Sequence, residues 1–180
     1  MKARDHIIIG AAASGALYPA LGLNTLWFFG ASFLIDIDHY LDFIFHNGFS
    51  DLSLKGMFSY HRRLVRYWNS PAFLSLEVFH TVEFMAPLYL IAMALGSAAL
   101  KAVFWGAMLH ILLDMVFLLR HKIFFKRSHS IVGYFISKKG LKRRGYDPGG
   151  VYISAVESVA DGGGGGGALT SNLTGDRRDV

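Results

Sequence analysis

The chain has 180 residues, of which 53% are hydrophobic and only 17% are Asp, Glu, Lys or Arg, against about 25% in an average soluble domain, so an ordinary soluble domain is excluded. The net charge of +5 does not indicate a nucleic-acid partner, because the basic residues flank apolar segments, as they do in membrane proteins. The absence of cysteine excludes disulfides, thiolate metal sites and cysteine nucleophiles.

A long apolar run opens the chain, with 29 consecutive uncharged residues from Ile7 to Ile35. A bilayer core takes about 20 apolar residues per helix, so this run is too long for one span. Residues that break helices or form turns interrupt it at Pro19, Gly22 and Asn24. We therefore expect two spans, 4–20 and 25–45. The apolar run continues past any signal-peptide cleavage point, so we expect the first helix to be retained.

Two further apolar segments, 71–95 and 98–119, predict a third and a fourth span. Pro71 suits the first turn of a helix, where its missing N–H costs little, and Gly96 predicts a turn between the two spans. The sequence therefore predicts an all-α fold, a multi-pass transmembrane helical bundle of about four spans.

The basic residues predict the orientation of these spans. With both termini in the cytoplasm, 17 of the 18 Lys and Arg residues lie on the cytoplasmic side, and only Lys101 lies outside. This bias is typical of the positive-inside rule. We expect a multi-pass protein of the inner cell membrane with cytoplasmic N- and C-termini.

Residues 52–68 predict an amphipathic helix that lies in the membrane interface. Its apolar and aromatic side holds Met57, Tyr60, His61, Leu64 and Trp68. Its basic side holds Arg62, Arg63 and Arg66, which could contact a phosphate-bearing lipid headgroup. The alternatives are a soluble amphipathic helix that covers the spans, and arginines that serve only orientation and adhesion to anionic lipid.

The composition divides the chain into a helical membrane domain, 1–144, and a tail, 145–180. The basic segment 120–144 carries a short apolar insert and predicts a second interfacial piece. The tail contains six consecutive glycines, 162–167, and is expected to be flexible because it has little apolar surface to bury.

Acids and histidines within apolar spans are costly to insert, which makes them candidates for function. His and carboxylate side chains spaced i, i+3 or i, i+4 on several helices are the usual way in which a helical bundle builds a metal site. The expected ligands of a divalent ion are Asp38, His39, His80, Glu83, His110 and Asp114, with His6 and His61 as additional candidates. Nitrogen and oxygen ligands suit zinc best, with manganese or iron as alternatives.

The same residues suggest a reaction and two alternatives to it. Asp36 or Glu83 is expected to act as general base on metal-bound water. Alternatively, His80 and His110 could be axial ligands of a haem, or the polar groups could conduct protons or ions. A purely structural role, with each histidine hydrogen-bonded to a neighbouring helix, is favoured for His46, His121 and His129.

The order of these motifs resembles the YdjM-like family of inner-membrane proteins, which are predicted metal-dependent hydrolases. Leu34-Ile35-Asp36-Ile37-Asp38-His39 is similar to the family's Leu-Pro-Asp-Ile-Asp-His motif, with Ile35 in place of proline. His110 and Asp114 match its later His-x-x-x-Asp motif, and His6 could be its early histidine. The family's middle His-Arg-Gly-x-Thr-His-Ser motif is not intact. His61-Arg62 supplies its start, but the next candidate, Phe79-His80-Thr81, places its histidine 19 residues after His61, where the family's motif has about five.

The resemblance covers about residues 6–120 and implies a divalent-metal hydrolase. Together with the membrane location it leads to a functional hypothesis, a membrane-embedded hydrolase of an amphiphilic ester or phosphoester, with lipid among the candidate substrates, near the cytoplasmic interface. The expected partners are membrane lipid and a small amphiphilic substrate, with no nucleic acid. No oligomeric state is predicted.

Overall fold

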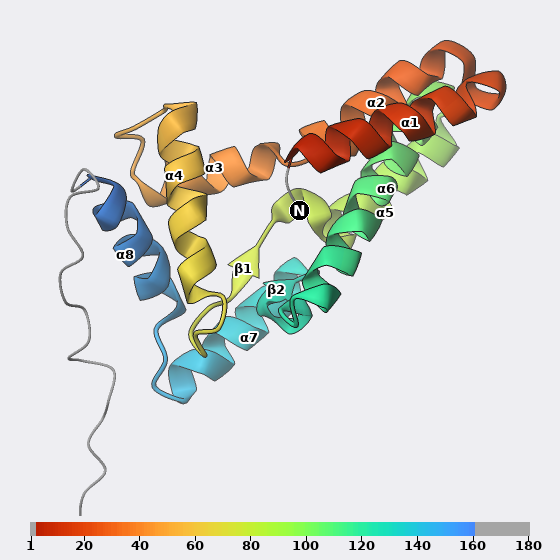
Figure 1. Cartoon of the computed structure of the whole chain (residues 1–180). Helices are drawn as coiled ribbons and strands as arrows, with labels where there is room; N and C mark the ends of the chain where they lie inside the picture. The colour runs from red at the N-terminus through yellow and green to blue at the C-terminus, as the bar shows by residue number, and fades with distance from the viewer. Residues whose placement is uncertain (1–2, 161–180) are drawn as a thin grey trace, which may run out of the picture.

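The structure is a computed structural model that describes residues 3–160. It is mostly helical, which confirms the all-α class (Figure 1). The main helices are α1 (Ala3–Leu21), α2 (Thr25–Leu34), α3 (Ile37–His46), α4 (Leu54–Leu64), α5 (Val82–Ala94), α6 (Ala98–Arg120), α7 (Ile131–Arg143) and α8 (Pro148–Ala160). Four short 3₁₀ segments, η1 (Gly22–Asn24), η2 (Val65–Tyr67), η3 (Val78–His80) and η4 (Phe124–Lys126), and two short strands, β1 (Ser75–Leu76) and β2 (Arg127–Ser128), connect them.

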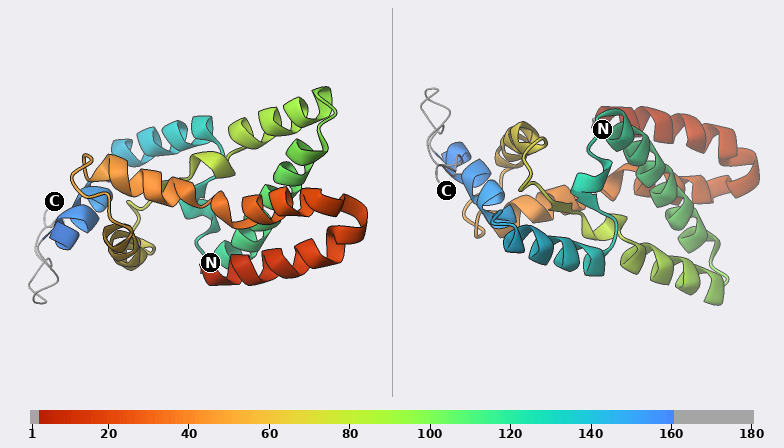
Figure 2. Two further views of the ribbon diagram at one scale, coloured as in Figure 1. Left: turned by 90° about the horizontal axis from the view of Figure 1, so that it is seen from above. Right: turned by 90° about the horizontal axis from the view of Figure 1, so that it is seen from below.

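The helices α1 and α2 form a hairpin that turns at η1. Gly22 has a positive φ of 54°, which glycine adopts without a steric penalty, and the Thr25 hydroxyl donates to its carbonyl oxygen at 2.7 Å. Helix α1 packs along α2, and a side chain in place of Gly10 would overlap Ser32. The helix breakers of the long apolar run therefore lie where the chain reverses direction (Figure 2).

A second hairpin, α5–α6, packs against the first. Gly96, with φ of 61°, makes the turn, and the Ser97 hydroxyl caps α6 by accepting from the Leu100 N–H at 3.3 Å. Helix α6 contacts α5 on one side and both α1 and α2 on the other. These four helices form one end of the molecule (Figure 2).

Among the described residues, two helical stretches are long and apolar enough to cross a membrane, namely 3–46, which folds back on itself at η1, and Ala98–Arg120. The segment expected as a third span, 71–95, is helical only from Val82, and α5 has 13 residues. It therefore reaches about 20 Å, against a hydrocarbon core of about 30 Å. Upstream of α5 the chain is extended at β1, which pairs in parallel with β2. The four-span arrangement stays a prediction.

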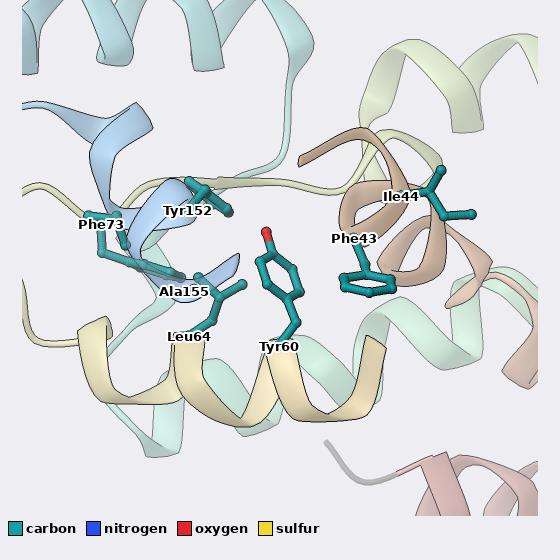
Figure 3. Packing of buried hydrophobic residues seen from close by; sticks show 8 residues of the cluster. Phe43, Ile44, Tyr60, Leu64, Phe73, Tyr152 and Ala155 are labelled. Carbon is teal, nitrogen blue, oxygen red and sulfur yellow. The ribbon is translucent and has the colours of Figure 1, made fainter. Parts of the chain in front are cut away.

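Helices α3, α4 and α8 form the other end of the molecule around a hydrophobic cluster (Figure 3). Tyr60 of α4 is fully buried between Phe43 of α3 and Tyr152 of α8, and its hydroxyl donates to Asp42 at 3.0 Å. The apolar side of α4 is therefore covered by protein. For residues 52–68, this arrangement favours an amphipathic helix that covers other helices over one that lies in the membrane interface.

The flexible tail expected at 145–180 is wrong in its first part, since Pro148–Ala160 form α8. Proline is suited to the first position of a helix, and the Asp147 carboxylate accepts from the Gly149 N–H at 3.0 Å. Val151, Tyr152 and Ala155 lie on one side of this helix and are buried. That apolar stripe outweighs the turn-forming composition around it. The glycine run 162–167 lies outside the described residues.

Candidate metal centre

Four acids and histidines from distant parts of the chain meet between the two ends of the molecule. Asp36, His80, His110 and Asp114 each offer one ligand atom, and these atoms lie within 4.8 Å of one another. Asp36 occupies the break between α2 and α3, where two residues leave regular helix, and His80 ends η3 just before α5. His110 and Asp114 lie one turn apart on α6. This buried group could hold a metal ion.

His110 presents one ring nitrogen to the group. Its side chain is fully buried, and its Nδ1–H donates to the Ser32 carbonyl oxygen at 2.9 Å. Because a carbonyl can only accept, the lone pair of the neutral ring lies on Nε2. That atom is 3.1 Å from Asp36 Oδ1 and makes no hydrogen bond within residues 3–160. A buried, unpaired imidazole nitrogen beside a carboxylate fits a metal ligand.

His80 also presents one ring nitrogen to the group, while its other ring nitrogen makes a hydrogen bond. Its Nδ1–H donates to Asp38 Oδ2 at 3.1 Å, an oxygen that also accepts from the Phe79 N–H. The free Nε2 lies 4.0 Å from Asp36 Oδ1 and has no hydrogen-bond partner in the described part of the chain. A carboxylate behind a histidine fixes the tautomer and orientation of a metal-binding ring. Asp38 therefore positions His80.

Asp114 is positioned by two basic side chains. His6 donates from Nε2 to Asp114 Oδ1 at 3.1 Å, and its ring stacks on that of His110 with centroids 3.7 Å apart. Arg127 donates from Nη1 to Asp114 Oδ2 at 2.8 Å. The early histidine thus supports the group and is not among the four residues that form it.

Arg127 is a site residue that the sequence analysis missed, because it lies in a basic segment assigned to membrane orientation. It is on β2, is 7% exposed, and pairs with Glu77 as well as Asp114. Burial lowers the pKa of Arg127 to about 10, and the neighbouring Asp38 and Asp36 oppose that shift. The guanidinium therefore stays charged at neutral pH.

A second group of ligand atoms adjoins the first. Asp36, Asp38 and His39 have one ligand atom each within 4.8 Å of the others. His39 Nδ1 lies 3.5 Å from Asp38 Oδ1, and His39 Nε2 lies 3.9 Å from Glu77 Oε1. Asp36, expected only as a general base, belongs to both groups.

Two residues expected as metal ligands, Glu83 and His61, belong to neither group. Glu83 accepts hydrogen bonds from the Ser130 hydroxyl at 2.6 Å and the Val132 N–H at 3.2 Å, so it supports the start of α7 and belongs to neither group. His61 donates from Nε2 to the His39 carbonyl oxygen at 2.8 Å. Burial and the nearby His39 lower the pKa of His61 to about 4, so it is neutral at pH 7 and braces the backbone at His39.

A cavity of about 650 Å³ opens onto both groups. Its lining includes the polar side chains of Asp36, His39, Glu77, Asp114 and Arg127. Its walls are largely apolar and include Met57, Leu64, Val65, Trp68, Phe73, Leu76, Phe117, Leu118 and Ile123. Of the three arginines expected to contact a headgroup, Arg62 lines this cavity, and Arg63 and Arg66 do not; Lys126 supplies a second cation.

The geometry disfavours haem. Asp36 Oδ1 lies 3.1 Å from His110 Nε2 and 4.0 Å from His80 Nε2, so a carboxylate stands where an iron and its macrocycle would lie. The ring centroids of the two histidines are only 5.1 Å apart.

Comparison with protein-family models, with curated proteins and with solved structures gives no match. The class of this protein is therefore described from its fold and its site alone. The chain is a helical protein with two apolar stretches long enough to cross a membrane and a buried His and Asp group that could hold a metal ion.

Proposed function

We propose that this protein is a membrane-embedded, divalent-metal-dependent hydrolase of an amphiphilic phosphoester or ester. The observation that carries the proposal is the pair of buried Nε2 atoms on His80 and His110. Each is unpaired within residues 3–160, and both face Asp36. Leaving two such nitrogens without partners costs free energy, which a bound cation would offset.

His80, His110, Asp36 and Asp114 would hold the ion through two nitrogens and two oxygens, a donor set that suits zinc, with manganese or iron as alternatives. A bound divalent ion supplies Lewis acidity and lowers the pKa of water toward neutrality. Asp36, expected as a general base, would serve as one of these ligands; its side chain is 25% exposed and lines the cavity. Glu83 is not proposed as a general base, because its carboxylate binds the start of α7.

The cavity supports an amphiphile as the substrate. Its many apolar lining residues suit a hydrocarbon chain, and its polar lining residues suit a polar headgroup. Arg62 and Lys126 place two positive charges in its lining, and guanidinium groups bind phosphate oxygens well. A phosphoester with one long apolar substituent matches both features, and lipids are among the compounds of this kind.

The outer surface of the hairpins supports a membrane location. A soluble protein rarely exposes so many large apolar side chains on adjacent helices. The strongly exposed ones on α1, α2, α5 and α6 include Ile8, Leu26, Trp27, Leu90, Trp105 and Leu112. We place these helices in the inner cell membrane, with both termini cytoplasmic, as the distribution of Lys and Arg favours. Membership of the YdjM-like family, through the motifs at Leu34–His39 and His110–Asp114, is part of the same proposal.

The test uses the full chain purified in detergent, stripped with a chelator and reloaded with zinc. Elemental analysis should show bound zinc, and a chromogenic alkyl nitrophenyl phosphate should be cleaved only by the reloaded protein. His110→Ala should abolish both, whereas His121→Ala, a change at an exposed histidine after α6, should retain both. A wild-type protein that binds no divalent ion contradicts the proposal. A Soret band in the purified protein would favour haem instead.

A further inference from the structure

The two groups of ligand atoms share a single residue. Asp36, His80, His110 and Asp114 form the first group, Asp36, Asp38 and His39 form the second, and only Asp36 belongs to both. Zinc lies about 2.0–2.2 Å from nitrogen and oxygen ligands, so two ligands of one ion are at most about 4.4 Å apart. The two groups do not merge into one even at the wider limit of 4.8 Å, so their ligand atoms do not all fit around one ion.

The second group has its own unpaired atoms. Asp38 Oδ1 and His39 Nδ1 are both buried and lie 3.5 Å apart, and neither has a hydrogen-bond partner among the described residues. The Asp38 side chain is only 6% exposed, and its other oxygen is already used by His80 and Phe79. One oxygen of Asp38 thus positions His80, while the other is left facing His39. A cation between them would satisfy both atoms.

The charge of the region is unbalanced without cations. Among the described side chains, four carboxylates, Asp36, Asp38, Glu77 and Asp114, meet one buried guanidinium, that of Arg127, and these five groups sum to a formal charge of −3. One divalent ion leaves these five groups with a net negative charge, which a second divalent ion would offset. Two divalent ions leave these groups with one positive charge, which adds to the charges of Arg62 and Lys126 in the cavity lining.

We infer that the site holds two divalent ions, one on His80, His110 and Asp114 and one on Asp38 and His39, with Asp36 bridging them. Bridged ions of this kind lie about 3.5–4 Å apart and clamp both oxygens of a displacement at phosphorus. A displacement at phosphorus has an attacking and a leaving oxygen for such a pair of ions, so we narrow the proposed substrate class from esters in general to phosphoesters. The inference rests on the proposed function for its first ion.

The experiment uses Mn²⁺ as the probe with the full chain in detergent. After chelator treatment, the protein is titrated with Mn²⁺, the bound ion is counted by elemental analysis after gel filtration, and the electron paramagnetic resonance spectrum is recorded. Wild-type protein should bind two ions per chain and give the exchange-coupled spectrum of a pair. His39→Gln should bind one ion and give the six-line spectrum of an isolated ion. His121→Gln, the matched control, should behave as wild type.

The outcomes separate the second ion from the proposed function. One ion per chain in the wild type overturns the two-ion site and leaves the mononuclear hydrolase standing. Two uncoupled ions, or two ions retained by His39→Gln, also overturn it, as does a loss of one ion in His121→Gln. No bound ion in any form overturns both proposals.

Discussion

Gly106 of α6 lies so close to α2 that a methyl group at position 106 would overlap the carbonyl oxygen of Phe28. One turn further along both helices, His110 Nδ1 donates to the Ser32 carbonyl oxygen at 2.9 Å. The two contacts are successive points of one helix–helix interface. The glycine lets the backbones approach, and that approach allows a histidine ring to reach a main-chain oxygen and to turn its other nitrogen toward Asp36.

Gly106→Ala should therefore separate α2 from α6 and weaken the site. Overpacking typically costs about 1–3 kcal/mol, which lowers the melting temperature of a chain of this size by roughly 2–12 °C. Thermal unfolding in detergent, followed by circular dichroism, measures the change, and zinc binding should weaken in parallel. Gly140→Ala in α7, where a methyl group meets open space, is the control, and alanine's helix propensity should leave its melting temperature equal or slightly higher. Equal melting temperatures for the two variants would argue against the close contact.

His6→Ala should weaken zinc binding although His6 is not among the four proposed ligands. It removes the hydrogen bond to Asp114 and the ring stacked on His110, and loss of such supporting partners typically costs about 10–100-fold in metal affinity. Competition with a chromogenic chelator measures the affinity. His6→Gln keeps a side-chain N–H donor and should recover part of the loss. An unchanged affinity in His6→Ala would show that Asp114 needs no support from α1.

Arg127→Met should destabilise the ion-free protein and strengthen its zinc binding. Removing one partner from a buried ion pair typically costs about 3–5 kcal/mol, and here Asp114 and Glu77 both lose theirs. The carboxylates of Asp114 and Glu77, left without their positive partner, then attract a divalent ion more strongly. The difference in melting temperature between zinc-loaded and stripped protein should thus be larger than in wild type. Arg66→Met, at an exposed arginine, should leave that difference unchanged. A smaller difference in Arg127→Met would mean that Arg127 supports the ion instead of competing with it.

Tyr152 connects α8 to the segment before β1, because its hydroxyl donates to the Leu74 carbonyl oxygen at 2.8 Å. Tyr152→Phe should cost about 1 kcal/mol through that hydrogen bond, and Tyr152→Ala about 3–5 kcal/mol through the lost packing. The order of melting temperatures should be wild type, Tyr152→Phe, Tyr152→Ala. Ile153→Ala, at the neighbouring exposed residue of α8, should stay close to wild type. Equal stability of all four proteins would indicate that α8 does not dock on α4.

The helical class could be predicted from the sequence because long uncharged runs and Gly, Pro and Asn interruptions are local signals. The error at Glu83 also has a local cause. A continuous helix over 71–95 would place Glu83 on the same side as His80, but η3 and the extended Thr81 break the helical register between them. The roles of Glu77 and Arg127 could not be read from the sequence. They depend on the pairing of two-residue strands 52 positions apart, Ser75 with Arg127, for which no periodic pattern exists.

The same reasoning applies to Asp36. Its motif marks it as polar within an apolar run, and periodicity places it on one face of a helix with Asp38 and His39. The structure interrupts the helix there, so Asp36 occupies a junction that two groups of side chains can share. Such a junction depends on where α3 packs, and α3 contacts both α4, which follows it, and α8, which comes much later in the chain.

The hydrogen bond between His6 and Asp114 joins positions 108 residues apart. Ribosomes add about 5–20 residues per second, so Asp114 is made roughly 5–20 s after His6. During that interval the nascent chain carries Asp36 and Asp38, which follow the first hairpin, without His80 and His110. The order of synthesis thus leaves these two acids without their later partners for several seconds, and a truncated chain that ends before α5 should be degraded by the cell instead of accumulating.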